Sequence, residues 1–594
     1  MPAGTRRAAA WGGLLLGCLL AARPAIAVEL DLQLADLPAT ARSRAEAVAS
    51  QAVSALPAVW QADPRTLRVV FDDQLPGHVA GRHWRGELRL STRLLDAPAP
   101  DAPHDPARAA LLHEIAHAFD RGQGGGWSEQ QGFRRLAGWD RIGGHNPYRL
   151  RSPDDYERHS PAEAFAVNLE WYLLDPAYAC RRPALARWFE STLGPAPLER
   201  PPCDSGLPLL GTGSVAGTLA LEDLDPARVY AVDYLLADSG GPPMSRFGHS
   251  MLRLVVCAPG REPGPRCRMD LAHHRVLSFR AFVDDVQVSS WRGLTGGYPS
   301  RLFMLPLDQV IDEYNRIELR DLRAWPLALD RKQIGGLLEA AARTHWSYDG
   351  DYTFVGNNCA VETGRLLDLA LDPQRGRHYR RTTPRGVLRV LARDGLVDPA
   401  AHDDVQAAQR EGKHFPSARA EYQQLHALLR GAGQLPALPL ERWLDSDAAT
   451  RGEVPAEVAL EHAAAWLVLE TAALRRAELR AADVLKRQWR RRDPAMAQVR
   501  EGAGNWSAHL GALSAPGNVI EGNGYGIPQP AELETVPATL AGWNQSASAH
   551  WRQLQQAGED ALPARDRLQI VQARERVAWL GTRVRELAAG QVER

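Results

Sequence analysis

Hydrophobic positions along the first 395 residues follow two different periods. Short runs rich in β-branched and aliphatic residues predict strands, and longer runs with apolar residues every three or four positions predict helices. The predicted strands are 66–72, 86–95, 229–237, 249–258 and 275–282. The predicted helices are 41–56, 111–120, 161–175, 307–319, 330–346 and one opened by Cys359. Strands and helices in this irregular order predict an α+β fold.

The pattern changes near residue 400, after which the chain is rich in Ala, Leu, Arg and Glu. One long helix is predicted from Pro455 to Arg491, and a second at 563–589. The second has apolar residues at helical spacing: Leu568, Val571, Val577, Leu580, Val584 and Leu587. An irregular Gly- and Pro-containing stretch, 515–530, separates them. We therefore predict an all-α C-terminal region.

The N-terminus carries the pattern of a secretory signal peptide. Arg6 and Arg7 precede the apolar run AAAWGGLLLGCLLAA, and AIA at 25–27 offers a small-residue cleavage site before Val28. The stretch LLGC at 15–18 resembles a bacterial lipobox, and cleavage there would give a form lipid-anchored through Cys18. We favour the soluble periplasmic form, because the apolar run continues past Cys18. No later segment is apolar and long enough to predict a membrane span.

The charge balance excludes one class of partner. The formal net charge is −1, so there is no electrostatic footprint for nucleic acid. One basic cluster, 486–492, ends a predicted helix. It is typical of a solvated helix end, where cations lie near the negative pole of the dipole. The alternative is contact with anionic lipid headgroups, hence a membrane surface.

Export favours disulfide formation among the five cysteines that follow the signal peptide. Cys257 and Cys267 flank a Gly- and Pro-rich turn between two predicted strands, so they can close a short hairpin. Cys180 and Cys203 bracket a local excursion of the chain. These two pairings leave Cys359 as the odd thiol, which is either buried or used chemically.

The sequence His113-Glu114-Ile115-Ala116-His117 predicts a metal site. It puts two imidazoles one helical turn apart, where both reach one Zn²⁺, with Glu114 beside them to take a proton from water. A carboxylate on the following helix, Glu163, is the expected third ligand. The alternative is an accidental motif on a structural helix, or a zincin scaffold that has lost its metal.

The spacing in YERHSPAEAFA, residues 156–166, resembles gluzincin peptidases of the anthrax lethal-factor type. The resemblance implies that His113, His117 and Glu163 hold the metal and that Glu114 is the base. It also implies that Tyr156 donates to the oxyanion of the transition state.

Cys359 is expected at the first turn of a helix, with Asn358 as the N-cap. Main-chain N–H groups and the helix dipole at this position predict a lowered thiol pKa. His249 is expected at the start of a strand after a glycine turn, in place to act as the base. The alternative is that Cys359 is simply a small buried core residue.

Five motifs carry a second resemblance: FGHSMLRL, LSFRAF, GLTGGYPSRLF, EYNRIELRDLRAWPL and YTFVGNNCAVETGRLLD. Together, over about 225–380, they look like the Lnb N-terminal periplasmic domain family, a permuted relative of NlpC/P60 and papain-like enzymes. Founding members transfer an acyl chain to the N-terminal amine of bacterial lipoproteins. The resemblance implies Cys359 as nucleophile and acyl-thioester carrier and His249 as general base. The third residue is open among Ser278, Asn357 and Tyr352.

These motifs predict four segments: a signal peptide at 1–27, a zincin-like metallopeptidase domain at 28–205, an Lnb-type cysteine enzyme domain at 206–395 and a helical region at 396–594. The stretch 202–214 is predicted to be a linker. Three functions follow: a cell-envelope thiol enzyme for acyl transfer or for amide or ester hydrolysis, a zinc peptidase with a binding module, or a non-enzymatic scaffold. The expected partner is a lipoprotein, a phospholipid or a peptidoglycan peptide.

Overall fold

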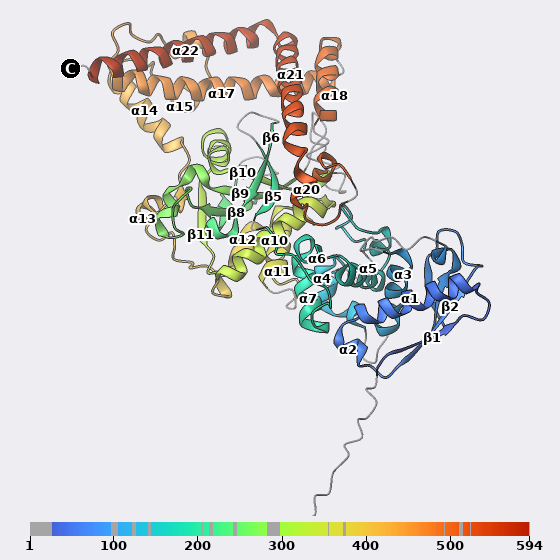
Figure 1. Ribbon diagram of the computed structural model, residues 1–594. Helices are drawn as coiled ribbons and strands as arrows, with labels where there is room; N and C mark the ends of the chain where they lie inside the picture. Colours follow the sequence, from blue (N-terminus) through green and yellow to red (C-terminus); the bar gives the residue numbers. More distant parts are fainter. Residues whose placement is uncertain are drawn as a thin grey trace, which may run out of the picture. The chain divides into compact units, whose positions relative to one another are not determined.

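The computed structural model (Figure 1) describes residues 27–96, 105–120, 126–140, 144–204, 206–212, 218–240, 246–281, 298–354, 356–371, 376–491, 493–509, 515–522 and 524–592. Residues 1–26 of the predicted signal peptide, with Cys18, lie outside these residues. The chain divides into two compact units, Met1–Ala118 with Phe189–Leu198, and Phe119–Trp188 with Glu199–Arg594. The domain boundaries predicted from the sequence stay predictions.

The first unit contains a four-stranded sheet in the order β1-β2-β4-β3. Its strands are β1 (Glu29–Gln33), β2 (Thr66–Asp72), β3 (Gly81–Trp84) and β4 (Glu87–Ser91). The first three in this order are parallel, whereas β3 pairs antiparallel with β4 at the edge. Its helices are α1 (Ala39–Ala55), α2 (Ala58–Gln61), η1 (Thr92–Leu95) and most of α3 (Pro106–Asp120). The predicted strand at 66–72 is confirmed, and α1 buries one face through Ala45, Val48, Ala49 and Ala52.

In the second unit, the segment before the large sheet is made of short helices. They are η2 (Trp127–Glu129), α4 (Gln131–Leu136), η3 (Asp155–Arg158), α5 (Pro161–Leu174), α6 (Tyr178–Arg181) and α7 (Pro183–Leu193), which crosses the boundary between the units. Phe133, Phe165 and Trp188 form a cluster of rings. Glu157 and Arg182 form a buried ion pair, which Asn168 extends. The predicted Cys180–Cys203 disulfide is confirmed.

A nine-stranded sheet forms the centre of the second unit, in the order β13-β11-β7-β8-β9-β10-β5-β6, with β12 paired to β10. The strands are β5 (Leu207–Thr212), β6 (Leu219–Leu224), β7 (Val229–Ala237), β8 (His249–Val256), β9 (Arg275–Ala281), β10 (Tyr298–Pro306), β11 (Leu322–Pro326), β12 (Gly350–Tyr352) and β13 (His414–Phe415). The connection between β8 and β9 contains η6 (Pro265–Met269) and η7 (Leu271–His273), and the predicted Cys257–Cys267 disulfide closes it.

The prediction of a linker at 202–214 was wrong. Part of this stretch is β5, which pairs antiparallel with β6 and parallel with β10. Leu209 and Leu210 are buried on its two sides. Glycines and prolines surround this short apolar run, which is why the sequence pattern indicated a linker. In the structure the run is a strand with a paired neighbour on each side, β6 and β10.

The two faces of the sheet belong to different cores. Leu252 and Leu254 of β8 pack with Leu337 and Leu366, from α10 (Arg331–Ser347) and α11 (Cys359–Leu371). Figure 1 shows α10 and α11 together with α12 (Pro384–Arg393) on this side. Met251, between the two leucines, belongs to a second cluster that includes Tyr314. Strand alternation therefore decides which core each β8 residue joins.

The predicted helix at 307–319 divides into two kinds of turn. It begins as α9 (Leu307–Ile311) and continues as a π-helical segment, Asp312–Ile317. The buried Tyr314 and Asn315 lie in the π-helical part. Such segments are rare and are found mostly at functional sites.

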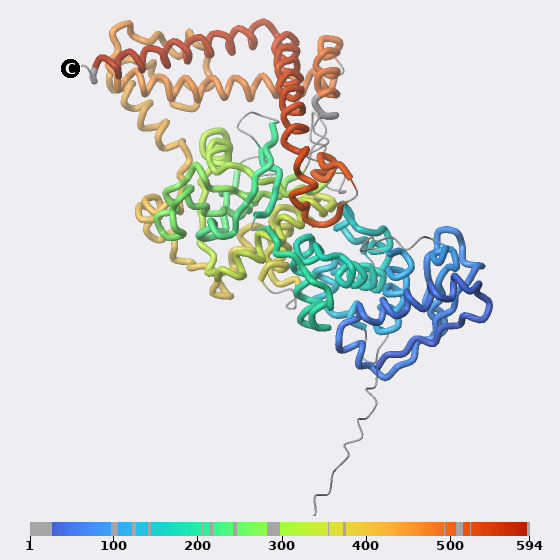
Figure 2. The backbone as a smooth tube through the Cα atoms, in the orientation of Figure 1, coloured from blue at the N-terminus to red at the C-terminus, as the bar shows by residue number. Residues whose placement is uncertain are grey.

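The C-terminal region is helical, as predicted. Its elements are α13 (Val405–Arg410), α14 (Arg419–Gly431), α15 (Leu440–Asp445), α16 (Ala448–Arg451), α17 (Leu460–Arg490), η9 (Pro494–Met496), α18 (Ala497–His509), η10 (Pro516–Val519), α20 (Pro530–Leu533), α21 (Val536–Ala561) and α22 (Ala564–Val592). Figure 2 shows α17 and α22 running side by side. Glu470, which interrupts an apolar run of α17, is fully buried and pairs with Arg451 and Arg576. The mixed α+β class with a helical C-terminal region is thus confirmed.

No helix in the described part of the chain combines the length and the apolar character that a membrane span requires.

Candidate active site

The first candidate centre lies on α3, which begins with Pro106. The Asp105 side chain accepts a hydrogen bond from the N–H of Ala107 and pairs with Arg44 at 2.8 Å, so this helix start is fixed. His113 and His117 follow on successive turns, and their Nε2 atoms lie 3.2 Å apart. Two nitrogens bound to one tetrahedral Zn²⁺ at about 2.0–2.1 Å lie roughly 3.3 Å apart. The separation of the two imidazoles therefore matches the one that zinc requires.

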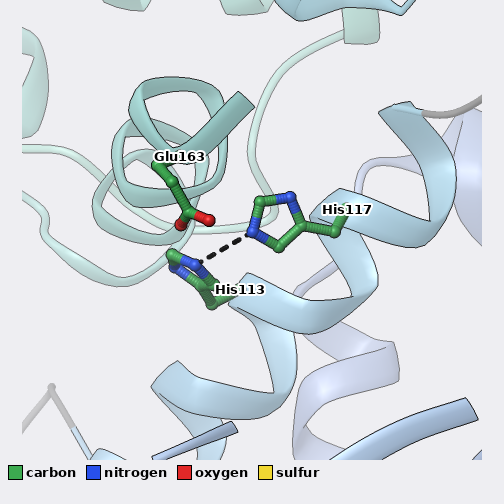
Figure 3. Close-up of side chains that lie close together, drawn as sticks. All are labelled: His113, His117 and Glu163. Atoms are coloured by element: carbon green, nitrogen blue, oxygen red, sulfur yellow. Dashed lines mark hydrogen bonds between the residues drawn. The ribbon is translucent and has the colours of Figure 1, made fainter. Parts of the chain in front are cut away.

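Glu163 is the third residue of this cluster. The ligand atoms of His113, His117 and Glu163 all lie within 4.8 Å of one another, and Figure 3 shows the carboxylate directed toward the two imidazoles. Glu163 occupies the first turn of α5, where its N–H donates to Ser160 Oγ at 3.1 Å. Ser160 caps the helix and Pro161 opens it, so local sequence fixes where Glu163 lies. The donor set, two imidazoles and one carboxylate, fits a catalytic zinc.

Glu114, the predicted base, is buried next to the edge strand of the first sheet. A Cβ added at Gly81 of β3 would lie 2.8 Å from Glu114 Oε1, so any larger residue there would displace this carboxylate. Among the described residues β3 is an edge strand that pairs only with β4, so one side of its main chain can accept another extended chain. A peptide added there would lie beside Glu114.

Tyr156 lies on η3 and is 38% exposed. Asp154 caps this short helix by accepting from the N–H of Tyr156 at 2.8 Å, and the Tyr156 ring packs edge-on against His159. Its assignment as an oxyanion donor stays a prediction.

The second candidate centre is at the start of α11. The Asn358 side chain accepts from the N–H of Ala360 at 3.0 Å, which confirms it as the cap. Cys359 is the free cysteine among the described residues and is 6% exposed. Its main-chain N–H donates to the hydroxyl of Tyr352 at 3.3 Å.

The predicted lowering of the thiol pKa was wrong. Burial raises the pKa of Cys359, although the N–H and side chain of Ser250, the Tyr352 hydroxyl and the N–H of Ala360 each act to lower it. The helix start does supply donors, but the thiol is almost entirely removed from water. The loss of hydration therefore outweighs these interactions.

His249, the predicted base, lies on the face of β8 opposite to the one that faces the Cys359 thiol. Its Nε2 lies 2.9 Å from Ser278 Oγ, and its ring stacks on Tyr314. Ser250, the next residue, faces the thiol instead. Burial, with Arg280 and Arg320, lowers the pKa of His249 to about 3, so the imidazole is neutral at neutral pH. The contacts of the described residues thus join His249 to Ser278 and Cys359 to Ser250 and Tyr352.

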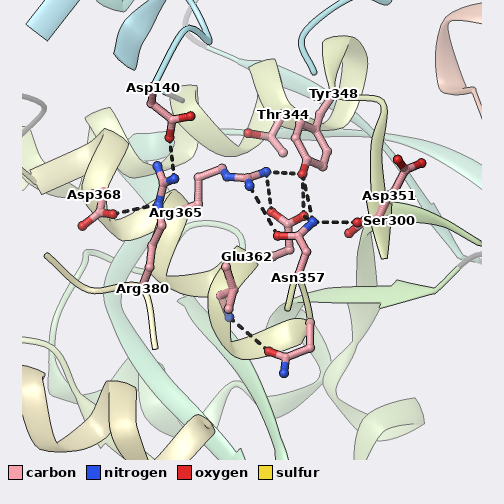
Figure 4. A network of polar contacts seen from close by, with 12 residues as sticks. Asp140, Ser300, Thr344, Tyr348, Asp351, Asn357, Glu362, Arg365, Asp368 and Arg380 are labelled. Carbon is pink, nitrogen blue, oxygen red and sulfur yellow. Dashed lines mark hydrogen bonds and ion pairs between the residues drawn. The ribbon is translucent and has the colours of Figure 1, made fainter. Parts of the chain in front are cut away.

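A buried polar network supports the loop that leads into Cys359 (Figure 4). Glu362 is fully buried, pairs with Arg365 at 2.9 Å and accepts from the Asn357 amide at 2.6 Å. Tyr348 also donates to Glu362, at 2.5 Å. The Asn357 amide in addition donates to the main-chain carbonyl of Asp351 at 2.7 Å.

Of the three residues considered for the third position, Ser278 therefore contacts the imidazole and Tyr352 the thiol side, while Asn357 supports the loop. Sequence reasoning missed Ser250 and Glu362. A charged residue three positions after Cys359 and three before Arg365, on a mostly apolar helix, was the available signal for Glu362.

Comparison with known families gives two matches. Residues 218–394 match the model of the Lnb N-terminal periplasmic domain, and residues 125–201 match a domain of unknown function, DUF7844. No curated protein and no solved structure matches the chain. The first match confirms the resemblance carried by the five motifs and agrees with an exported protein of the cell envelope. The central part of this chain, residues 218–394, is therefore similar to the Lnb N-terminal periplasmic domain.

Proposed function

We propose that this protein is a metal-dependent peptidase of the periplasm, with its centre on α3. The observation that carries the proposal is the 3.2 Å separation of the His113 and His117 Nε2 atoms, with a third ligand at Glu163. Two neutral imidazoles whose nitrogens lie this close require a shared proton or a cation between them. A cation held also by a carboxylate satisfies all three groups.

Each residue has a separate task in this proposal. Zn²⁺, when bound, supplies a Lewis acid that acidifies water and polarises a carbonyl. Glu114 accepts the proton of the attacking water and returns it to the leaving amine. The edge of β3 binds the substrate as an added strand, which holds its scissile bond next to Glu114. Tyr156 is the proposed donor to the oxyanion.

The test is hydrolysis of a quenched-fluorescence peptide library by the full mature chain. Glu114→Gln should lower kcat by at least about a hundredfold, because the base is lost while the ligands remain. His113→Ala should lose both activity and metal. His78→Ala, which removes an exposed histidine of the same unit, is the matched control and should behave as wild type. Equal activity of the Glu114→Gln and wild-type chains would exclude the proposal.

A second candidate function is acyl transfer, or amide or ester hydrolysis, through a thioester on Cys359. It is favoured by the family match and by a free thiol at a helix start in a chain whose other described cysteines are paired. In this proposal the carbonyl carbon of the acyl donor bonds to the sulfur, the donor's leaving group departs with the thiol proton, and an amine or water then takes the acyl group. The neutral His249 is the proposed proton acceptor, and it must move toward the sulfur to act.

A lipid-like acyl electrophile tests this second candidate. It should label Cys359 in the native protein, and Cys359→Ser should abolish the labelling. His249→Ala should slow labelling by at least tenfold, whereas Arg389→Gln, at an exposed arginine of α12, should not change it. Labelling at the wild-type rate in the His249→Ala chain would mean that the two residues do not act as a pair.

A further inference from the structure

A cavity of about 560 Å³ lies in the second unit, and none of its lining residues belongs to either candidate centre. Its apolar walls come from α4, α7 and the C-terminal end of α11, through Leu136, Leu185, Leu369 and Leu371. This volume is within the range of about 300–1,000 Å³ that is typical of small-molecule sites. The cavity adjoins the end of α11 opposite to Cys359, about 18 Å away along a helix of 13 residues.

The charged groups of this cavity are mostly cations. Arg182 is neutralised by Glu157, at 2.9 Å, and Arg187 by Glu339 at the rim, at 2.5 Å. Arg343 has no such anion: in the described part of the chain no hydrogen bond or ion pair joins it to another residue. Its guanidinium lies over the ring of Tyr148, 4.2 Å from the centroid, and is partly buried.

The position of Arg343 carries a cost that a ligand would remove. Burial lowers the pKa of this arginine and Arg182 adds to the effect, while Tyr148, Glu157 and Tyr178 only partly offset it, so its charge is incompletely compensated by its surroundings. A guanidinium binds a carboxylate through two parallel hydrogen bonds, and it does so more strongly where water is partly excluded.

Two glycines of α10 line the cavity. A Cβ added at Gly335 would meet nothing within 4 Å, and one at Gly336 would meet only the carbonyl oxygen of Ala370 at 3.5 Å. Glycine in a helix interior is unfavourable by about 1 kcal/mol relative to alanine. The adjacent pair therefore costs helix stability in the wall of the cavity, where side chains larger than alanine would take up space.

We propose that this cavity binds the carboxylate form of an unbranched fatty acid, with the head on Arg343 and the chain along the leucine walls. Of the cavity cations without an ion pair among the described residues, Lys332 is exposed and Arg343 is partly buried, so Arg343 sets the negative charge of the ligand head and the apolar walls set an aliphatic tail. The site does not depend on the activity of either candidate centre, so it can be tested whether or not those proposals hold.

Calorimetric titration of the mature protein with dodecanoate, below its micelle concentration, tests the proposal. One molecule should bind per chain, and shortening the probe to decanoate or octanoate should weaken binding by up to about fourfold per CH₂ removed. Dodecyltrimethylammonium, with the same tail and a cationic head, should bind at least tenfold more weakly. Equal binding of the two head groups, or affinity independent of chain length, would overturn the proposal.

Substitutions in the cavity give an independent check. Gly335→Leu should abolish dodecanoate binding by filling the space, whereas Gly335→Ala should keep most of it and stabilise α10. Arg343→Gln should weaken binding at least tenfold, Arg343→Lys should retain part of it, and Arg389→Gln outside the cavity should change nothing. Unchanged binding in a folded Gly335→Leu protein would show that dodecanoate binds elsewhere.

Discussion

Glu362→Leu is predicted to loosen the start of α11 and expose the thiol of Cys359. Glu362 is fully buried and accepts from Tyr348 and Asn357 while it pairs with Arg365. Leucine would leave the Arg365 guanidinium buried without its anion, and breaking a buried pair in this way costs about 3–5 kcal/mol. If that cost falls on local opening of the 353–362 segment, the population of the open form rises roughly a hundred- to several-thousand-fold.

The assay is the rate at which a neutral maleimide labels Cys359 in the native protein, measured at low reagent concentration so that opening is at equilibrium. Global stability is followed in parallel by denaturant unfolding. The double variant Glu362→Leu/Arg365→Met removes both charges and should restore slow labelling to within about tenfold of wild type. Glu441→Gln, in a half-exposed pair with Arg419, is the matched control and should cost about 0–1 kcal/mol. Labelling unchanged by Glu362→Leu, or no recovery in the double variant, would refute the reasoning.

Three further predictions concern the other sites. Burial lowers the pKa of His249 to about 3, so between about pH 6.5 and 3 the unfolded chain binds a proton at this residue that the folded chain does not. The free energy of unfolding should therefore decrease as pH falls through this window. His249→Phe should flatten that part of the pH–stability curve. A curve identical for both proteins would be inconsistent with a neutral buried imidazole. The Cys180–Cys203 disulfide closes a loop with a sequence separation of 23. The Cys180→Ala/Cys203→Ala protein should therefore lose about 3 kcal/mol of the free energy of unfolding, measured by urea titration. A loss below about 1 kcal/mol would contradict the assignment of this disulfide. Gly81→Ala should lower peptidase activity without releasing the metal, since the added methyl group displaces Glu114; metal loss equal to that of His113→Ala would instead indicate a disrupted fold.

Features encoded locally were predictable from the sequence. The strands Thr66–Asp72 and Val229–Ala237 follow from runs of β-branched and aliphatic residues, and both disulfides follow from local cysteine spacing in an exported chain. The Asn358 cap and the His113–His117 spacing likewise depend only on helix geometry.

Features set by distant packing were not predictable. The sheet order places β5 between β6 and β10, and only that pairing shows that its short apolar run is a strand. The face of β8 on which His249 lies depends on strand register, which is set by distant packing. In the structure His249 stacks on Tyr314 of the π-helical segment. The sequence analysis predicted that His249 acts on Cys359. Neighbouring residues of a strand point to opposite faces, so the residue of β8 that faces the thiol is Ser250, one position after His249. The thiol pKa was misjudged for the same reason, since its burial depends on residues far away in the chain.

Metal analysis of the mature protein, purified from the periplasm without chelators, tests the central proposal most directly. Inductively coupled plasma mass spectrometry of the wild-type chain should find close to one zinc per molecule. Glu114→Gln should retain that zinc, and His113→Ala and Glu163→Ala should each lose it. Wild-type protein that contains no zinc, and takes none up at micromolar Zn²⁺, would contradict a metal centre on α3.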